Sequence, residues 1–224
     1  MTKATCIRVA ALGAAALLFL ALGAALRPLV IDEPQVSTTV LNDTEIGFIQ
    51  DMAGHHQQAL MMVQRLDPGI DPGVARLAQQ IGDAQRIEVG TLMGWLRLAG
   101  VTAANPAPMA WMGADHETGG AHTHRATVPP ADPPADQPAA LMPGMATTAE
   151  LDALATARGR DAETLFLQLM QRHHLGGIAM AQAADHLLDE GPVKQTARSM
   201  ILEQGSETGL MTALLDQRGA QPLG

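Results

Sequence analysis

Residues 43–62 read DTEIGFIQDMAGHHQQALMM, and residues 161–180 read DAETLFLQLMQRHHLGGIAM. The two stretches carry identical or similar residues at one constant offset, without a gap, which indicates an internal repeat. The matched pairs are Asp43 and Asp161, Phe48 and Phe166, Met52 and Met170, His55 and His173, His56 and His174, Leu60 and Ile178, and Met62 and Met180.

A second block extends the repeat at an offset that is one residue longer. It matches Gln85, Glu88, Leu92, Trp95 and Leu96 with Gln204, Glu207, Met211, Leu214 and Leu215. Turn-forming residues separate the two blocks of each half: Asp67-Pro68-Gly69 and Asp71-Pro72-Gly73 in the first, and Glu190-Gly191-Pro192 in the second. Such residues end one helix and begin the next, so each half is predicted to be a helical hairpin.

The segment between the halves, residues 100–148, is rich in Pro, Ala, Gly and Met and has no sustained hydrophobic period, which favours a mobile crossover. Two hairpins joined by one long connection predict an all-α fold, a ferritin-like four-helix bundle made of two duplicated helical hairpins with a long crossover loop. The predicted domain spans residues 41–217, with repeat one at 41–99 and repeat two at 149–217. Only 2% of the residues are aromatic, which also favours helices over strands.

Residues 1–31 are predicted to be a signal or anchor segment. Lys3 and Arg8 precede an uncharged run from Val9 to Leu26, and this charge bias places the rest of the chain outside the cytoplasm. The protein is therefore expected to be exported, and either secreted or held at the membrane through this helix if it is not cleaved. Cys6, the single cysteine, precedes the run, so a metal site in the folded domain would have to use His, Met, Asp or Glu.

Composition argues against several classes of function. The net charge of -9 leaves no basic field for a phosphate backbone, so nucleic acid is not an expected partner. The sequence has no Ser-His-Asp arrangement, glycine-rich phosphate loop or Cys-x-x-Cys motif to support hydrolase, nucleotide or thiol redox chemistry.

Polar residues occupy the apolar faces of all four predicted helices. On a helical wheel His55 and His56 both fall within the apolar arc with Met52 between them, and His173, His174 and Met170 repeat this pattern. Glu88 and Glu207 likewise fall in the apolar arcs of the partner helices. Buried imidazoles and carboxylates need partners, so these groups are expected to meet one another or an ion.

The residue types predict a metal site, most simply for copper. Imidazole suits copper, zinc, iron and nickel, while thioether sulfur selects the cuprous ion. Glu88 and Glu207 are interpreted as acceptors that orient imidazole N–H groups, or as ligands themselves. The candidate metal residues are His55, His56, His173, His174, Met52, Met170, Glu88, Glu207, Met62 and Met180, with copper as the expected ion and another transition metal as the alternative.

Three other interpretations stay open. The His and Glu residues could form a structural polar layer that fixes the register of the bundle. The protein could be a metal-dependent oxidase, although neither half contains the Glu-x-x-His motif of di-iron bundles, which favours a non-enzymatic role. The crossover could capture metal through His116, His122, His124, Met109, Met112, Met142 and Met145, or be only a solvated linker. A protein partner is not identified.

The two Met-x-x-His-His motifs and the Met142-Pro143-Gly144-Met145 stretch resemble the bacterial family called domain of unknown function 305, over residues 41–217. The resemblance implies a ferritin-like bundle, export, and in some relatives an association with copper handling, but no agreed reaction. The sequence departs from the usual pattern at Gly54 and Gly176, and each glycine is expected to loosen its helix by about 1 kcal/mol.

Overall fold

The computed structural model describes residues 13–22, 40–116 and 142–223. Residues 13–22 are helical and belong to a unit of their own, which spans residues 1–38, while residues 39–224 form a second compact unit. No helix within the described ranges is long and apolar enough to cross a membrane. The remainder of the predicted signal or anchor segment lies outside the described residues.

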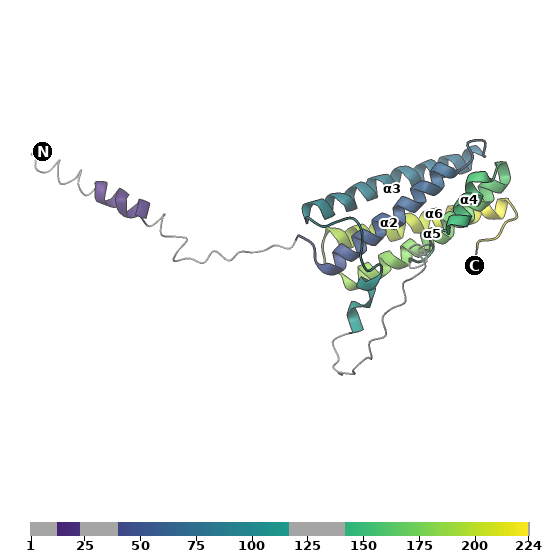
Figure 1. The fold of residues 1–224 in the computed structure, drawn as a ribbon. Coiled ribbons are helices and arrows are strands. Elements are labelled where there is room, and N and C mark those ends of the chain that lie inside the picture. Colours follow the sequence, from purple (N-terminus) through teal and green to yellow (C-terminus); the bar gives the residue numbers. More distant parts are fainter. Residues whose placement is uncertain (1–12, 23–39, 117–141, 224) are drawn as a thin grey trace, which may run out of the picture. The chain divides into compact units, whose positions relative to one another are not determined.

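The second unit is built from four long helices, and every regular element described in it is helical (Figure 1). The four long helices are α2 (Asp43–Arg65), α3 (Pro72–Leu98), α5 (Gly159–Leu187) and α6 (Pro192–Gln217). Helix α2 packs against α3, α5 packs against α6, and α2 and α5 join the two pairs. The predicted all-α fold and the two helical hairpins are confirmed, while the ferritin-like detail stays a prediction.

The sequence sets the ends of these helices through local hydrogen bonds. Asn42 and Glu45 form a reciprocal capping box at the start of α2, and Asp71 caps α3 by accepting from the backbone N–H of Gly73. Pro72 and Pro192 stand in the first turns of α3 and α6, where a missing N–H is harmless. The turn motifs that predicted hairpins therefore act as helix boundaries.

The structure corrects the prediction of a mobile crossover at both of its ends. Residues 101–116 return along α2 and include the short 3-10 helix η1 (Ala110–His116), and Ala146 near the other end is held by Gln58 of α2. An additional helix, α4 (Thr148–Thr156), opens the second repeat before α5. Thr147 and Glu150 form a capping box for α4, and Arg172 of α5 binds Glu150 at 2.7 Å, which lowers the pKa of that carboxyl to about 2. The central part of the crossover, residues 117–141, lies outside the described residues.

Asp51 holds the first of these ends in place. Its buried carboxylate accepts hydrogen bonds from Asn105 Nδ2 at 2.8 Å, the Met109 backbone N–H at 2.7 Å and Trp111 Nε1 at 2.9 Å. The Trp111 ring meets Phe48 edge to face with centroids 5.5 Å apart. Asp51 therefore anchors the returning loop to α2.

We expect Asp51→Ala to destabilise the protein by about 2–4 kcal/mol, because the buried Trp111 Nε1–H and the Met109 N–H would lose a charged acceptor. Gln57→Ala, at an exposed position of the same helix, should change the free energy of unfolding by less than about 0.5 kcal/mol. Urea unfolding followed by circular dichroism compares the two variants. Equal effects of both would mean that the loop is not anchored through Asp51.

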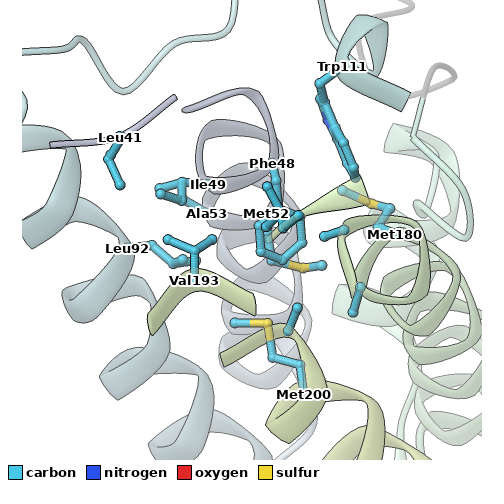
Figure 2. Close-up of a cluster of buried hydrophobic side chains, with 14 of the residues drawn as sticks. Leu41, Phe48, Ile49, Met52, Ala53, Leu92, Trp111, Met180, Val193 and Met200 are labelled. Atoms are coloured by element: carbon cyan, nitrogen blue, oxygen red, sulfur yellow. The ribbon is translucent and has the colours of Figure 1, made fainter. Parts of the chain in front are cut away.

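The core consists of two apolar clusters at opposite ends of the bundle. The first, shown in part in Figure 2, includes Phe48, Met52, Leu92, Met180 and Met200. The second has as members Met62, Ile81, Phe166, Met170 and Met211. Along each of the four long helices, polar residues separate the members of one cluster from those of the other, so a polar layer crosses the middle of the bundle.

Candidate metal centre

Four histidines form the centre of the polar layer. His55 and His56 of α2 and His173 and His174 of α5 are all 0% exposed, as their positions on the apolar faces predicted. The rings of His55 and His173 meet between the two helices, with centroids 3.7 Å apart and planes tilted by 33°. The repeat therefore brings its two equivalent histidines into direct contact.

The hydrogen bonds of these rings fix their tautomers. His55 Nε2 lies 3.1 Å from the carbonyl oxygen of Pro143, and His173 Nε2 lies 3.1 Å from the carbonyl oxygen of His55. A carbonyl oxygen can only accept, so each Nε2 carries the hydrogen and donates it. The lone pair of each neutral ring is then on Nδ1.

The other two histidines contact carboxylates at matched positions of the repeat. His174 Nε2 forms a hydrogen bond with Glu207 Oε2 at 2.7 Å. His56 Nε2 lies 2.7 Å from Glu88 Oε2 but is not aligned for a hydrogen bond. In all four rings Nδ1 is buried and has no hydrogen-bond partner.

Burial keeps the central pair neutral. Desolvation, followed by the nearby His56, lowers the pKa of His55 from 6.5 to about 3. Desolvation, followed by the adjacent His55, holds the pKa of His173 well below its usual value. A neutral imidazole with a free lone pair is the form that binds a metal ion, so these rings fit that role near pH 7.

These shifts predict that acid destabilises the fold. Between pH 6.5 and about 3 the unfolded chain binds a proton at His55 that the folded chain excludes, so stability falls as the pH falls through this window. We expect a loss of about 1.4 kcal/mol per pH unit for each such histidine. Urea unfolding at pH 7, 6, 5 and 4 measures it, and His186→Ala, at an exposed site of α5, should leave the slope intact. A flat profile would contradict the neutral pair.

Further polar groups of the layer were not among the predicted ligands. Gln85 and Gln204 are 2% and 3% exposed, and their side chains hold amide atoms without partners. Their matched positions in the repeat were the signal that could have singled them out. Glu203 lies near Glu88 and Glu207, and burial together with these two carboxylates raises its pKa.

The predicted methionines flank the histidine layer on both sides. Met52 and Met180 belong to the first apolar cluster, Met62 and Met170 belong to the second, and all four are fully buried. The structure thus places thioether sulfurs at either side of the imidazoles. Whether any of them acts as a ligand stays a prediction.

A backbone strap, residues 142–146, closes one side of the layer. Pro143 accepts from His55, and Gln58 of α2 exchanges two hydrogen bonds with the backbone of Ala146, at 2.7 and 2.8 Å. A Cβ atom on Gly176 would lie 2.0 Å from the Pro143 carbonyl oxygen. Gly176 therefore has a packing role that the sequence did not indicate, because its lack of a side chain admits the strap.

Within the described residues, no group of three or more His, Cys, Asp or Glu side chains converges in a way that could hold a metal ion. Joint binding of one ion by three or more of the four histidines therefore requires at least one ring to turn. Of the loop residues, Met112 lies within η1, and Met109 and Met142 pack on the first cluster. His122, His124 and the side chain of His116 lie outside the described residues.

Comparison with known proteins places the chain in a family. The model for "Domain of unknown function (DUF305)" matches residues 45–215. A DUF305 protein from Streptomyces coelicolor, assigned as a secreted protein, is 36% identical over 81% of this chain and 96% of its own, with a TM-score of 0.66. A DUF305 fragment from Deinococcus radiodurans is 28% identical over 79% of this chain and 97% of its own, with a TM-score of 0.57.

CopM shares the fold at lower identity. Its Cu(I)-bound structure is 20% identical, covers 79% of this chain and 98% of its own, and has a TM-score of 0.54. Its Cu(II)-bound structure is 21% identical, with 77% of this chain and 96% of the CopM chain covered, and has a TM-score of 0.52. No curated protein sequence matches the chain. The family model and the Streptomyces relative together show that this chain belongs to the DUF305 family.

Proposed function

We propose that this protein binds copper outside the cytoplasm, through the four buried imidazoles of α2 and α5, and so sequesters the ion. One observation carries the proposal. Three of the four rings form a hydrogen bond between Nε2 and an oxygen atom, His56 Nε2 lies 2.7 Å from Glu88 Oε2, and all four rings have a buried Nδ1 without a partner, at matched positions of the two repeats.

This arrangement has the chemistry of a metal site. A buried acceptor without a partner costs about 1–3 kcal/mol, and a bound cation would remove that cost. Histidines that bind metals usually donate their second ring N–H to a carboxylate or a backbone carbonyl, which fixes the ring and raises its basicity. Glu207 and the Pro143 carbonyl are acceptors of this kind, and Glu88 Oε2 lies 2.7 Å from His56 Nε2.

The donor set favours copper over harder ions. Imidazole nitrogen and thioether sulfur suit cuprous ion, and imidazole also suits cupric ion. Met52 and Met170 each precede a paired histidine by one helical turn, and both are fully buried. The fold shared with copper-bound CopM is compatible with this choice, and the apolar N-terminal run and the secreted Streptomyces relative support export.

A structural polar layer is the second candidate, and the stacked pair favours it. The ring centroids of His55 and His173 lie 3.7 Å apart, and the two Glu–His contacts are already made without an ion. Such a layer would fix the register of α2 against α5, because any slip would separate the matched groups. The two candidate functions differ in whether the histidine layer binds copper when the ion is added.

The test is equilibrium titration of the full chain with Cu(I) under reducing conditions and with Cu(II). We expect the parent to bind copper and a variant with His55, His56, His173 and His174 changed to alanine to lose that binding while remaining helical. His186→Ala is a matched control, because this histidine is exposed on the same helix as His173. A second control replaces His116, His122 and His124. Binding that survives the first variant and disappears in the second would assign it to the crossover instead.

A further inference from the structure

The polar layer holds a surplus of hydrogen-bond acceptors. A neutral imidazole whose Nε2 carries the hydrogen can only accept at Nδ1, and an amide oxygen can only accept as well. Among the described residues, the buried side-chain atoms of this kind without a partner are Nδ1 of His55 and His173 and Oε1 of Gln85, Gln171 and Gln204. A cation binds lone pairs without needing a donor in return, so this surplus favours an ion within the layer.

Gln204 reaches from α6 to α5 at a glycine. It is 3% exposed, and a Cβ atom on Gly177 would lie 2.5 Å from Gln204 Oε1. Real Cβ contacts are essentially never that short, so the amide group occupies this position only because residue 177 has no side chain. Ala59 stands at the matching position of the first repeat, at the offset of the paired histidines. The repeat itself therefore does not require a glycine, and Gly177 makes room for the amide oxygen of Gln204.

The position of Gly177 on α5 brings this oxygen next to two of the histidines. On the helical wheel Gly177 falls between them, about 40° from His173 and about 60° from His174, one turn further along the helix. Side chains of a helix lean toward its N-terminus, so the space beside Gly177 lies over the turn that carries both histidines. On α6, Gln204 precedes Glu207 by one turn, and Glu207 Oε2 lies 2.7 Å from His174 Nε2. Both helices therefore place Gln204 Oε1 beside the buried rings of α5.

The first repeat carries the same kind of buried amide. Gln85, the counterpart of Gln204, is 2% exposed and also leaves Oε1 without a partner. Burying a polar group without a hydrogen bond destabilises a fold, so apolar side chains would serve packing better at both positions. Two unpartnered amide oxygens at matched positions therefore point to a ligand that the layer accepts.

We propose that Gln204 supplies an oxygen ligand for cupric ion, beside the Nδ1 atoms of His173 and His174, and so raises the preference of the copper site for Cu(II) over Cu(I). The inference rests on the proposed function and adds the residue that sets the oxidation state. Within the described residues, His, Cys, Asp and Glu side chains do not gather in threes that could hold an ion, so an amide oxygen supplies a donor that they lack. Cupric ion favours nitrogen and oxygen ligands, whereas cuprous ion favours soft sulfur ligands.

The test compares the affinities of the full chain for the two oxidation states. Cu(II), and Cu(I) under reducing conditions, are each titrated in competition with a chelator of known affinity. Gln204→Met keeps a side chain of similar length and replaces the amide by a thioether. Its affinity for Cu(II) should fall about 10-fold, at the lower end of what removing a group beside a metal usually costs, while its affinity for Cu(I) stays at the parent level or rises. Gln195→Met, at an exposed position of the same helix, should leave both affinities unchanged.

A second variant keeps the oxygen. Gln204→Glu should hold the affinity for Cu(II) at or above that of the parent, because a carboxylate oxygen replaces the amide oxygen as a ligand. Electron paramagnetic resonance of the Cu(II)-loaded chain gives an independent readout, since the hyperfine splitting of copper depends on its ligand atoms. This splitting should change in Gln204→Met and not in Gln195→Met, and circular dichroism checks that each variant is folded.

The outcomes separate this inference from the proposed function. If Gln204→Met lowers the affinities for Cu(II) and Cu(I) by the same factor, the side chain only packs the layer and the inference is overturned. Unchanged affinities in a folded Gln204→Met variant would overturn it as well, and both results leave the proposed function standing. A parent chain that binds neither ion would overturn the proposed function and this inference together.

Discussion

Gly176→Ala is expected to destabilise the protein by about 3 kcal/mol, at the upper end of what over-packing usually costs, and to detach the strap from α5. The added Cβ would lie 2.0 Å from the Pro143 carbonyl oxygen, 2.4 Å from the carbonyl carbon and 2.9 Å from the Gly144 nitrogen. All three are backbone atoms, which cannot turn away as a side chain can. Thermal unfolding and limited proteolysis at the strap measure the two effects.

Gly54→Ala is the matched control on the other histidine helix. Its Cβ would meet only Met142 Cε at 4.0 Å, an ordinary contact with a flexible side chain. Alanine is the better helix former, so this variant should be as stable as the parent or gain up to about 1 kcal/mol. If both substitutions stabilise the protein, the strap does not pack directly against Gly176.

Replacing His55 and His173 together by leucine is expected to weaken copper binding while leaving the free energy of unfolding nearly unchanged. Copper affinity should fall by at least about 100-fold, because two imidazole ligands disappear. The free energy of unfolding at pH 7 should stay within about 1.5 kcal/mol of the parent, since leucine is close in volume and removes two unpartnered Nδ1 atoms, while the Pro143 carbonyl loses one hydrogen bond. The loss of stability between pH 6.5 and 3 should largely vanish with the two rings.

The same variant distinguishes the two candidate functions. If the histidines only fix the register of the bundle, the leucine pair should leave copper uptake at the parent level while broadening the unfolding transition. Isothermal titration with copper and urea unfolding on one preparation give both quantities. Unchanged copper affinity in a well-folded leucine variant would remove His55 and His173 from the proposed site.

The helices and the buried histidines could be predicted because they depend on short-range periodicity. Each histidine pair falls within an apolar arc, and the duplication of the pattern at His173 and His174 shows that the placement in the first copy is not accidental. Turn residues such as Pro72 and Pro192 then marked where the helices begin. These features need no knowledge of what lies across the bundle.

Long-range contacts account for what sequence reasoning missed. Asp51 has Leu169 as its counterpart in the repeat, and the difference follows from the loop of residues 101–116, which Asp51 anchors through Trp111. The role of Gly176 depends on Pro143, which only the fold brings alongside it. Helix α4 did leave a local signal, the capping box of Thr147 and Glu150.

Ring orientation is the part of the site that no sequence pattern indicates. The tautomer of His55 follows from the carbonyl of Pro143, and that of His173 follows from the carbonyl of His55. Both acceptors are backbone atoms supplied by another segment of the chain. The repeat predicts which residues meet in the layer, and the packing decides which nitrogen of each ring is left to bind.

A crystal structure of the copper-loaded chain, with the metal located by its anomalous scattering, tests the central claim most directly. We expect copper within about 2.0–2.2 Å of Nδ1 atoms from histidines of both α2 and α5, with at least one ring of the His55 and His173 pair turned from its stacked position. Copper bound only by crossover residues, with all four Nδ1 atoms still unligated, would contradict the account and leave the histidines as a structural layer.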